Sequence, residues 1–209
     1  MQAWFESMNA GWLILLIVGL AGIALLGIWL RQRRETAWRR VARRLRLKSR
    51  QTSTGPVVQG LHSGHRLMLR LAPDSSDTGA GVVVGEFSVD VPGAPAGMIA
   101  RAVPGVMGEI AGLAEQRLLL GDDRFDSNTH VSGEPEQAIR EFWTPQRRET
   151  FLELLNTIPF DRLLLEAGLL KVERRGVLDD PDALEQELLQ LLTAAQALSA
   201  SPAGHAGAG

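Results

Sequence analysis

Cysteine and tyrosine are both absent from this chain of 209 residues. Without cysteine the protein cannot form disulfide bonds, use a thiol as a nucleophile or bind a metal through thiolates. The sequence also lacks a Walker A loop, a Gly-x-Ser-x-Gly elbow and the His-Glu-x-x-His pattern of zinc proteases. The hydrophobic share of 45% excludes a wholly disordered chain. We therefore expect a folded protein that is not an enzyme.

Charge is scarce in one part of the chain and concentrated in the next. Residues 7–30 contain no charged side chain, whereas residues 31–50 contain ten basic side chains against one acid, Glu35. Residues 51–209 carry 12 basic and 22 acidic side chains, so the small net charge of -2 conceals a basic segment followed by an acidic region. This polarity indicates a basic element that meets an anionic surface and an acidic domain beyond it.

The uncharged stretch has the length of a membrane-spanning helix. Apolar and small residues run without interruption from Gly11 to Leu30, and a helix of that length covers roughly 30 Å, the thickness of a bilayer's hydrocarbon core. Trp12 and Trp29 lie near its ends, where the interface favours indole rings. The flanking residues lack the pattern of a cleaved signal peptide. We predict an uncleaved anchor. The segment contains no Gly-x-x-x-Gly pair, so its sequence does not indicate that the helix dimerises.

Basic residues on one side of the anchor predict its orientation. Five arginines follow it closely: Arg31, Arg33, Arg34, Arg39 and Arg40. Glu6 is the one charged side chain before it. Because basic flanks stay in the cytoplasm, residues 31–209 are predicted to be cytoplasmic and the N-terminus to lie outside the inner, or cell, membrane. The predicted topology is single-pass.

The basic segment has the spacing of an amphipathic helix. Trp38, Val41, Ala42 and Leu45 recur at helical intervals and form one apolar stripe. Arginines occupy much of the remaining surface: Arg39, Arg40, Arg43 and Arg44. The helix is predicted either to lie on anionic headgroups or to be the first helix of the domain, and the two are compatible. Nucleic-acid binding is not expected, since no aromatic residues interleave with the basic ones after Trp38.

Residues 51–199 are predicted to form an α+β domain with a mainly antiparallel sheet and flanking helices. Strands are predicted at Val57–Leu61, Arg66–Leu71, Val82–Val91 (bulged at Gly85), Met98–Val103, Leu163–Glu166 and Leu169–Arg175. Ser63-Gly64 and Ala167-Gly168 are predicted hairpin turns. Helices are predicted at Glu134–Trp143, Pro145–Ile158 and from Pro181 to about Ser199, with Thr144 and Asp180 as N-caps. Leu113–Leu120 fits a helix or a strand.

A short motif precedes the predicted helices. Its residues are Gly121, Asp122, Phe125 and Asp126, followed by Phe142-Trp143 and the pair Thr144 and Pro145. The combination resembles an uncharacterised family of bacterial membrane-anchored domains with a Gly-Asp-x-x-Phe-Asp-x-x-Phe pattern, a Val-rich strand, a helix and a Thr-Pro helix start. The resemblance covers residues 36–199, and Thr129 replaces the second aromatic residue. It implies a membrane-anchored domain and assigns no activity, cofactor or catalytic residue.

The acidic residues of this motif are the first candidates for chemistry. Asp122, Asp123 and Asp126 could ligate Ca²⁺ or Mg²⁺, but the spacing of an EF-hand and its closing glutamate are absent. The simpler interpretation is that an aspartate caps a turn and Phe125 packs in the core.

Two further patterns have equally simple interpretations. His62 and His65 face each other across a predicted turn, but no third metal ligand is indicated. The glycines of residues 79–85 precede an apolar run, whereas a dinucleotide loop follows a strand. We expect no catalytic, metal or cofactor site.

These observations predict four regions. Residues 1–30 form a periplasmic stub and a transmembrane helix, 31–50 a basic juxtamembrane helix, 51–199 the cytoplasmic domain and 200–209 a disordered tail. The predicted function is an interaction or assembly module with two partners, the lipid bilayer and another protein. The alternatives are a regulatory domain that responds to anionic lipid and a membrane-tethered enzyme.

Overall fold

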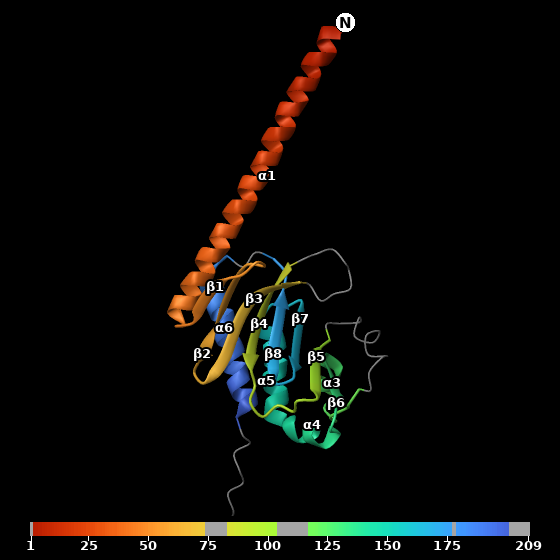
Figure 1. Cartoon of the computed structure of the whole chain (residues 1–209). Coiled ribbons are helices and arrows are strands. Elements are labelled where there is room, and N and C mark those ends of the chain that lie inside the picture. The colour runs from red at the N-terminus through yellow and green to blue at the C-terminus, as the bar shows by residue number, and fades with distance from the viewer. Residues whose placement is uncertain (1, 74–82, 104–116, 177–178, 201–209) are drawn as a thin grey trace, which may run out of the picture.

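The computed structural model describes residues 2–73, 83–103, 117–176 and 179–200. It has the predicted α+β architecture: a long N-terminal helix, an eight-stranded antiparallel sheet and further helices packed on the sheet (Figure 1). The predicted tail at 201–209 lies outside the described residues, as do residues 113–116 of the ambiguous segment and the glycines at 79 and 81.

Helix α1 (Gln2–Arg44) runs without a break through two different environments. The side chains of Ile14–Trp29 are exposed, and α1 is the one helix among the described residues that is long and apolar enough to cross a membrane. Farther along the same helix, Trp38 and Val41 are fully buried in the core of the domain. The apolar stripe therefore packs in the core, and the arginines beside it face outward.

The sheet has the strand order β1-β2-β3-β4-β8-β7-β5-β6, and all neighbouring strands are antiparallel. Its strands are β1 (Lys48–Gln51), β2 (Pro56–His62), β3 (His65–Pro73), β4 (Val83–Asp90), β5 (Met98–Ala102), β6 (Thr129–Gly133), β7 (Arg162–Glu166) and β8 (Leu169–Arg174). Six of them correspond to the predicted strands. Both predicted hairpin turns are confirmed by positive φ at their two central residues, Ser63-Gly64 and Ala167-Gly168.

Three features of the sheet differ from the predictions. The basic segment does not stay helical to residue 50, because α1 ends at Arg44 and Lys48–Gln51 forms an edge strand. Strand β6, which the family resemblance alone implied, occupies the opposite edge. The predicted bulge at Gly85 is wrong, since Gly85 pairs in register with both Leu71 and Arg174.

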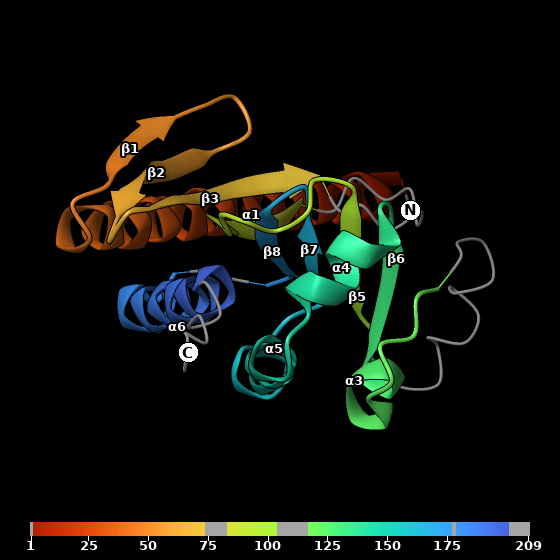
Figure 2. The ribbon, with the colours of Figure 1, turned by 90° about the horizontal axis from the view of Figure 1, so that it is seen from below.

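Helices cover one face of the sheet, as Figure 2 shows for α5 and α6. The described helices after the first strands are α3 (Asp123–Asn128), α4 (Glu136–Phe142), α5 (Pro145–Thr157) and α6 (Pro181–Ser199). Thr144 and Asp180 cap α5 and α6 through their side chains, as predicted, with proline at the first helical turn of each. The short helix α3 was not predicted.

A single hydrophobic core joins the elements. Alternate residues of β3, among them Leu67 and Leu69, point toward the helices and are almost fully buried. They belong to the same cluster as Trp38 of α1, Phe151 of α5 and Leu191 of α6. The C-terminal part of α1 is therefore an integral part of the domain's core.

Candidate functional site

Residues singled out by the sequence lie in two separate places. The tryptophans and arginines lie on α1, which leaves the domain at one end. The Gly-Asp motif and the Thr-Pro helix start lie around α3, α4 and the start of α5, near the β6 edge of the sheet, whereas α1 lies near the β1 edge (Figure 1). The two groups of residues are not in contact, so they do not form one site.

The arginines of α1 form ion pairs with the beginning of α6. The Arg33 Nε atom lies 3.0 Å from a carboxylate oxygen of Asp179, just before α6. Arg44, eleven residues farther along α1, pairs with Asp182 and with Glu185, the latter at 2.7 Å. These ion pairs hold the acidic start of α6 against α1.

Other arginines of α1 have different surroundings. Arg31 and Arg39 flank Glu35 at 3.3 and 3.8 Å. The Arg43 Nε atom donates to the Arg39 carbonyl. Arg40 is exposed, and its side chain has no ion pair or hydrogen bond with any of the described residues. Arg34 is half-buried, and its Nε atom lacks a hydrogen-bond partner in the described part of the chain.

A pocket of about 380 Å³ lies where α1 meets the segment before α6. One wall is a single stripe of α1: Trp29, Gln32, Arg33, Thr36, Ala37 and Arg40. The other wall is Asp179 and Pro181. The Arg33 guanidinium lies 5.1 Å from the centre of the Trp29 ring, in cation–π contact. We call this cavity the joint pocket.

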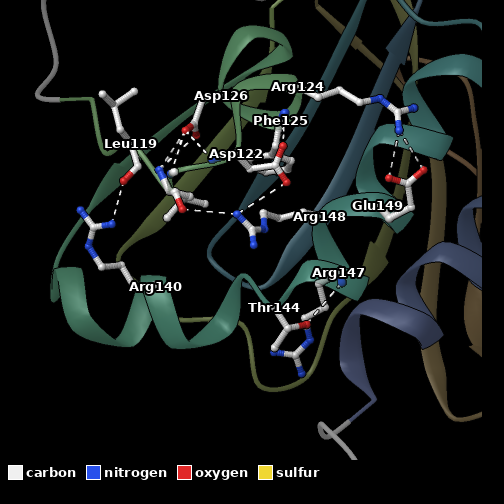
Figure 3. A network of polar contacts seen from close by, with 12 residues as sticks. Leu119, Asp122, Arg124, Phe125, Asp126, Arg140, Thr144, Arg147, Arg148 and Glu149 are labelled. Carbon is white, nitrogen blue, oxygen red and sulfur yellow. Dashed lines mark hydrogen bonds and ion pairs between the residues drawn. The ribbon is translucent and has the colours of Figure 1, made fainter.

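The Gly-Asp motif builds a tight corner before β6. The Asp126 carboxylate accepts hydrogen bonds from three successive backbone N–H groups, those of Leu120, Gly121 and Asp122 (Figure 3). Asp122 in turn caps α3 by accepting from the Phe125 N–H at 3.1 Å. Gly121 has φ +76°, which only glycine adopts without strain. The motif therefore fixes the backbone around a buried Phe125.

Two arginines attach this corner to the helices beside it. Arg140 of α4 donates to the Leu119 carbonyl at 2.7 Å. Arg148 of α5 donates to the Leu120 carbonyl at 3.3 Å and lies 3.6 Å from the Asp122 carboxylate (Figure 3). The Leu118 N–H pairs with the Val131 carbonyl and so covers part of the β6 edge.

Aromatic rings fill the space under the corner. Phe125 lies 4.9 Å from Trp143 and 6.1 Å from Phe151, measured between ring centres. Arg147 lies above the Phe142 ring at 4.4 Å and donates to the carbonyls of Phe142 and Ala200. Burial lowers the pKa of the Arg147 guanidinium below its usual value. These contacts make the motif a structural junction.

The metal hypotheses have no support in the geometry. Asp126 already accepts three N–H groups, and His62 and His65 place their Nδ1 atoms on the carbonyls of Leu45 and Asp90. Among the described residues, no group of three or more potential ligands converges on one point.

Two larger grooves lie elsewhere on the domain. One of about 610 Å³ follows α5 and α6 and is lined by Glu153, Asp182 and Glu185, with no basic residue among its described lining. The other, of about 690 Å³, lies beside the β2–β3 hairpin and is lined by Arg46, Lys48 and Arg66, with no acidic residue among its described lining. We call them the acidic groove and the basic groove. Sequence reasoning found neither, because their residues come from separate elements.

Each groove also has an exposed leucine. Leu189, in the acidic groove, is 39% exposed, and Leu61, in the basic groove, is 71% exposed. Leu119 is the remaining large hydrophobic side chain that is exposed among the described residues after α1. A single exposed leucine is normal on a protein surface, so the shape and charge of the grooves, and not these side chains alone, make them candidates for binding a partner.

Comparisons with known proteins give little further information. No family model matches the chain, and no curated protein matches it. Its structure is similar to the crystal structure of the mycobacterial trehalose monomycolate transport factor A, with a TM-score of 0.48 and 14% sequence identity over 81% of this chain and 94% of that chain. A likeness of this size supports no inference about activity or partners.

Proposed function

We propose that this protein is a single-pass membrane protein that presents an α+β interaction or assembly module on the cytoplasmic side of the cell membrane. The observation that supports this most directly is the continuity of α1, in which an exposed apolar stretch passes directly into a buried core helix. The helix contains no proline, the usual cause of a sharp kink. The anchor therefore holds the domain at a fixed height and angle, which suits a protein that positions a binding surface.

The topology is tested with fusions to the C-terminus of the full chain. We expect fluorescence from a fused green fluorescent protein and no activity from a fused alkaline phosphatase, because ten basic residues follow the anchor closely. A matched variant replaces Arg31, Arg33 and Arg34 by glutamine and places three arginines before Gly11, which should increase phosphatase activity. Phosphatase activity from the unaltered chain would contradict the orientation, and release by alkaline carbonate would contradict the anchor.

Partner binding is tested by crosslinking from the two grooves in native membranes. A photoreactive amino acid is placed at Leu189, in the acidic groove, or at Leu61, in the basic groove. Ser127, which is exposed on α3 and lies outside both grooves, is the matched control. We expect a discrete adduct from at least one groove position and none from Ser127. Absence of adducts at both leucines would contradict the proposal.

A lipid-responsive role is the second candidate, and the exposed arginines of α1 favour it. Arg39, Arg40 and Arg43 are exposed, and each basic residue near an anionic surface contributes about 1 kcal/mol to binding. This role predicts that domain orientation in lipid nanodiscs changes when anionic lipid is added, and that 0.5 M salt reverses the change. An orientation that does not depend on lipid charge would exclude it.

A further inference from the structure

If α1 spans the bilayer from Gly11 to Leu30, the joint pocket begins at the depth of the lipid headgroups and extends from there toward the domain. At 1.5 Å per residue, Arg33 is about 5 Å and Arg40 about 15 Å beyond the end of the apolar segment. The headgroup layer on each side of a bilayer is roughly 5–8 Å thick. Side chains on a helix tilt toward its N-terminus, so the Arg40 side chain extends from its backbone position toward this layer. Trp29 lies at the boundary, where tryptophan is favoured.

The polar groups of the pocket suit a phosphate ester. Arg33, Arg40 and Gln32 supply N–H donors on one face of α1. Arg33 has five such donors and uses its Nε atom on Asp179; no other described residue accepts from this side chain, so its remaining N–H groups are available. Arg40 has no competing partner among the described residues. A pocket of about 380 Å³ is large enough for a headgroup and its phosphate.

Charge decides which lipid fits. Arg33 and Arg40 supply two positive charges and Asp179 one negative charge, so the pocket has a net charge of +1. A phosphodiester with an uncharged headgroup has a charge of −1 and neutralises the pocket. A zwitterionic lipid adds a cationic group that the pocket does not balance, because Arg33 already pairs with the one carboxylate.

We infer that the joint pocket binds one anionic phospholipid of the cytoplasmic leaflet, with the phosphate held by Arg33 and Arg40 and the Trp29 ring against the lipid's glycerol region. This inference rests on the proposed function, because it requires α1 to span the membrane. It goes beyond a general attraction between arginines and headgroups: it assigns one site with a fixed stoichiometry and a preferred lipid class.

The test uses the full chain in nanodiscs of equal parts phosphatidylglycerol and phosphatidylcholine, with retained lipids counted by native mass spectrometry. We expect one phosphatidylglycerol to be retained in preference to phosphatidylcholine. Arg40→Gln and Arg33→Gln should each lower this retention about fivefold, the equivalent of about 1 kcal/mol per arginine. Arg31→Gln is the matched control for Arg33→Gln: it removes the same charge about 3 Å away along the helix axis, from a residue that pairs with Glu35 and lies outside the pocket.

The outcomes separate the inference from the proposed function. If the chain does not enter nanodiscs, the proposed function fails and the inference with it. If it enters but retains the two lipids equally, or loses as much with Arg31→Gln as with Arg33→Gln, the inference alone is overturned. Inorganic phosphate at 10 mM should not displace the lipid, and displacement would identify a soluble phosphate as the ligand.

Discussion

Arg33 and Asp179 join two parts of the chain that are far apart in sequence, with the Arg33 Nε atom 3.0 Å from the Asp179 carboxylate. Arg33 is three residues beyond the apolar segment, and Asp179 lies two residues before helix α6. The same guanidinium lies above the Trp29 ring. One side chain therefore links the end of the apolar segment to the start of α6, and in the lipid site inferred above the carboxylate would limit how strongly Arg33 binds an anion.

Removing that limit gives the first prediction. Asp179→Asn should increase retention of phosphatidylglycerol by the full chain about fivefold, because Arg33 no longer shares its charge with a carboxylate. Asp182→Asn is the control, since it makes the same change in net charge but releases Arg44, which lies outside the joint pocket. Native mass spectrometry after nanodisc release measures both variants. Equal gains in the two variants would indicate a general electrostatic effect.

Two tryptophans on α1 provide the second prediction. Trp38 is fully buried, whereas Trp29 is 51% exposed nine residues earlier on the same helix. Trp38→Ala should lower the free energy of unfolding of the domain by about 3–5 kcal/mol and its Tm by roughly 10 °C, because it leaves a cavity in the core. Trp29→Ala should leave the Tm within about 2 °C. Calorimetry of the full chain in mild detergent measures both, and a stable Trp38→Ala variant would contradict the role of α1 in the core.

The elements that could be predicted from sequence are those specified by local chemistry. The pairs Ser63-Gly64 and Ala167-Gly168 adopt the turn conformation that their residue types favour, and Thr144 and Asp180 cap the helices that they precede. The sequence also predicted the apolar stripe that contains Trp38. Whether this stripe packs on the membrane surface or in the core could not be decided from the neighbouring residues alone. It is decided by packing against β2 and α6, which are distant in sequence.

Elements that were missed depend on distant partners. Lys48–Gln51 is entirely exposed and has no apolar alternation, so only its pairing with β2 makes it a strand. The first four residues of Thr129–Gly133 are buried on both faces, at an edge that the Leu118 N–H partly covers. The residues of α1 that line the joint pocket recur at helical intervals, which the sequence shows. The sequence does not show that Asp179 and Pro181, far along the chain, form its second wall.

The Gly-Asp corner gives the third prediction. Asp126→Asn should lower the free energy of unfolding by about 2 kcal/mol and the Tm by about 5 °C, because a neutral amide accepts the three N–H groups more weakly than the charged carboxylate does, and its NH2 group replaces an oxygen that also accepts from Leu120. Asp123→Asn is the control: Asp123 is exposed on the same short helix. Calorimetry compares the two. Equal stability of both variants would remove the structural role assigned to the motif.

Strands β3 and β4 provide the last prediction, through the ion pair of Arg70 and Glu86. The Arg70 Nε and Nη2 atoms each donate to one carboxylate oxygen at 2.9 Å, and these hydrogen bonds raise the pKa of Arg70 above its usual value. Because the Glu86 side chain is only 9% exposed, Arg70→Met leaves a buried carboxylate unpaired and should cost about 2 kcal/mol. Adding Glu86→Leu should restore most of that loss, so a double-mutant cycle measured by chemical denaturation should give a coupling energy above about 1 kcal/mol.

The matched control is the Arg124–Glu149 pair, which has a similar distance of 3.2 Å with side chains 61% and 60% exposed. The coupling energy of this pair should stay below about 0.5 kcal/mol. Equal coupling in the two pairs would mean that burial of Glu86 adds nothing to the strength of the pair.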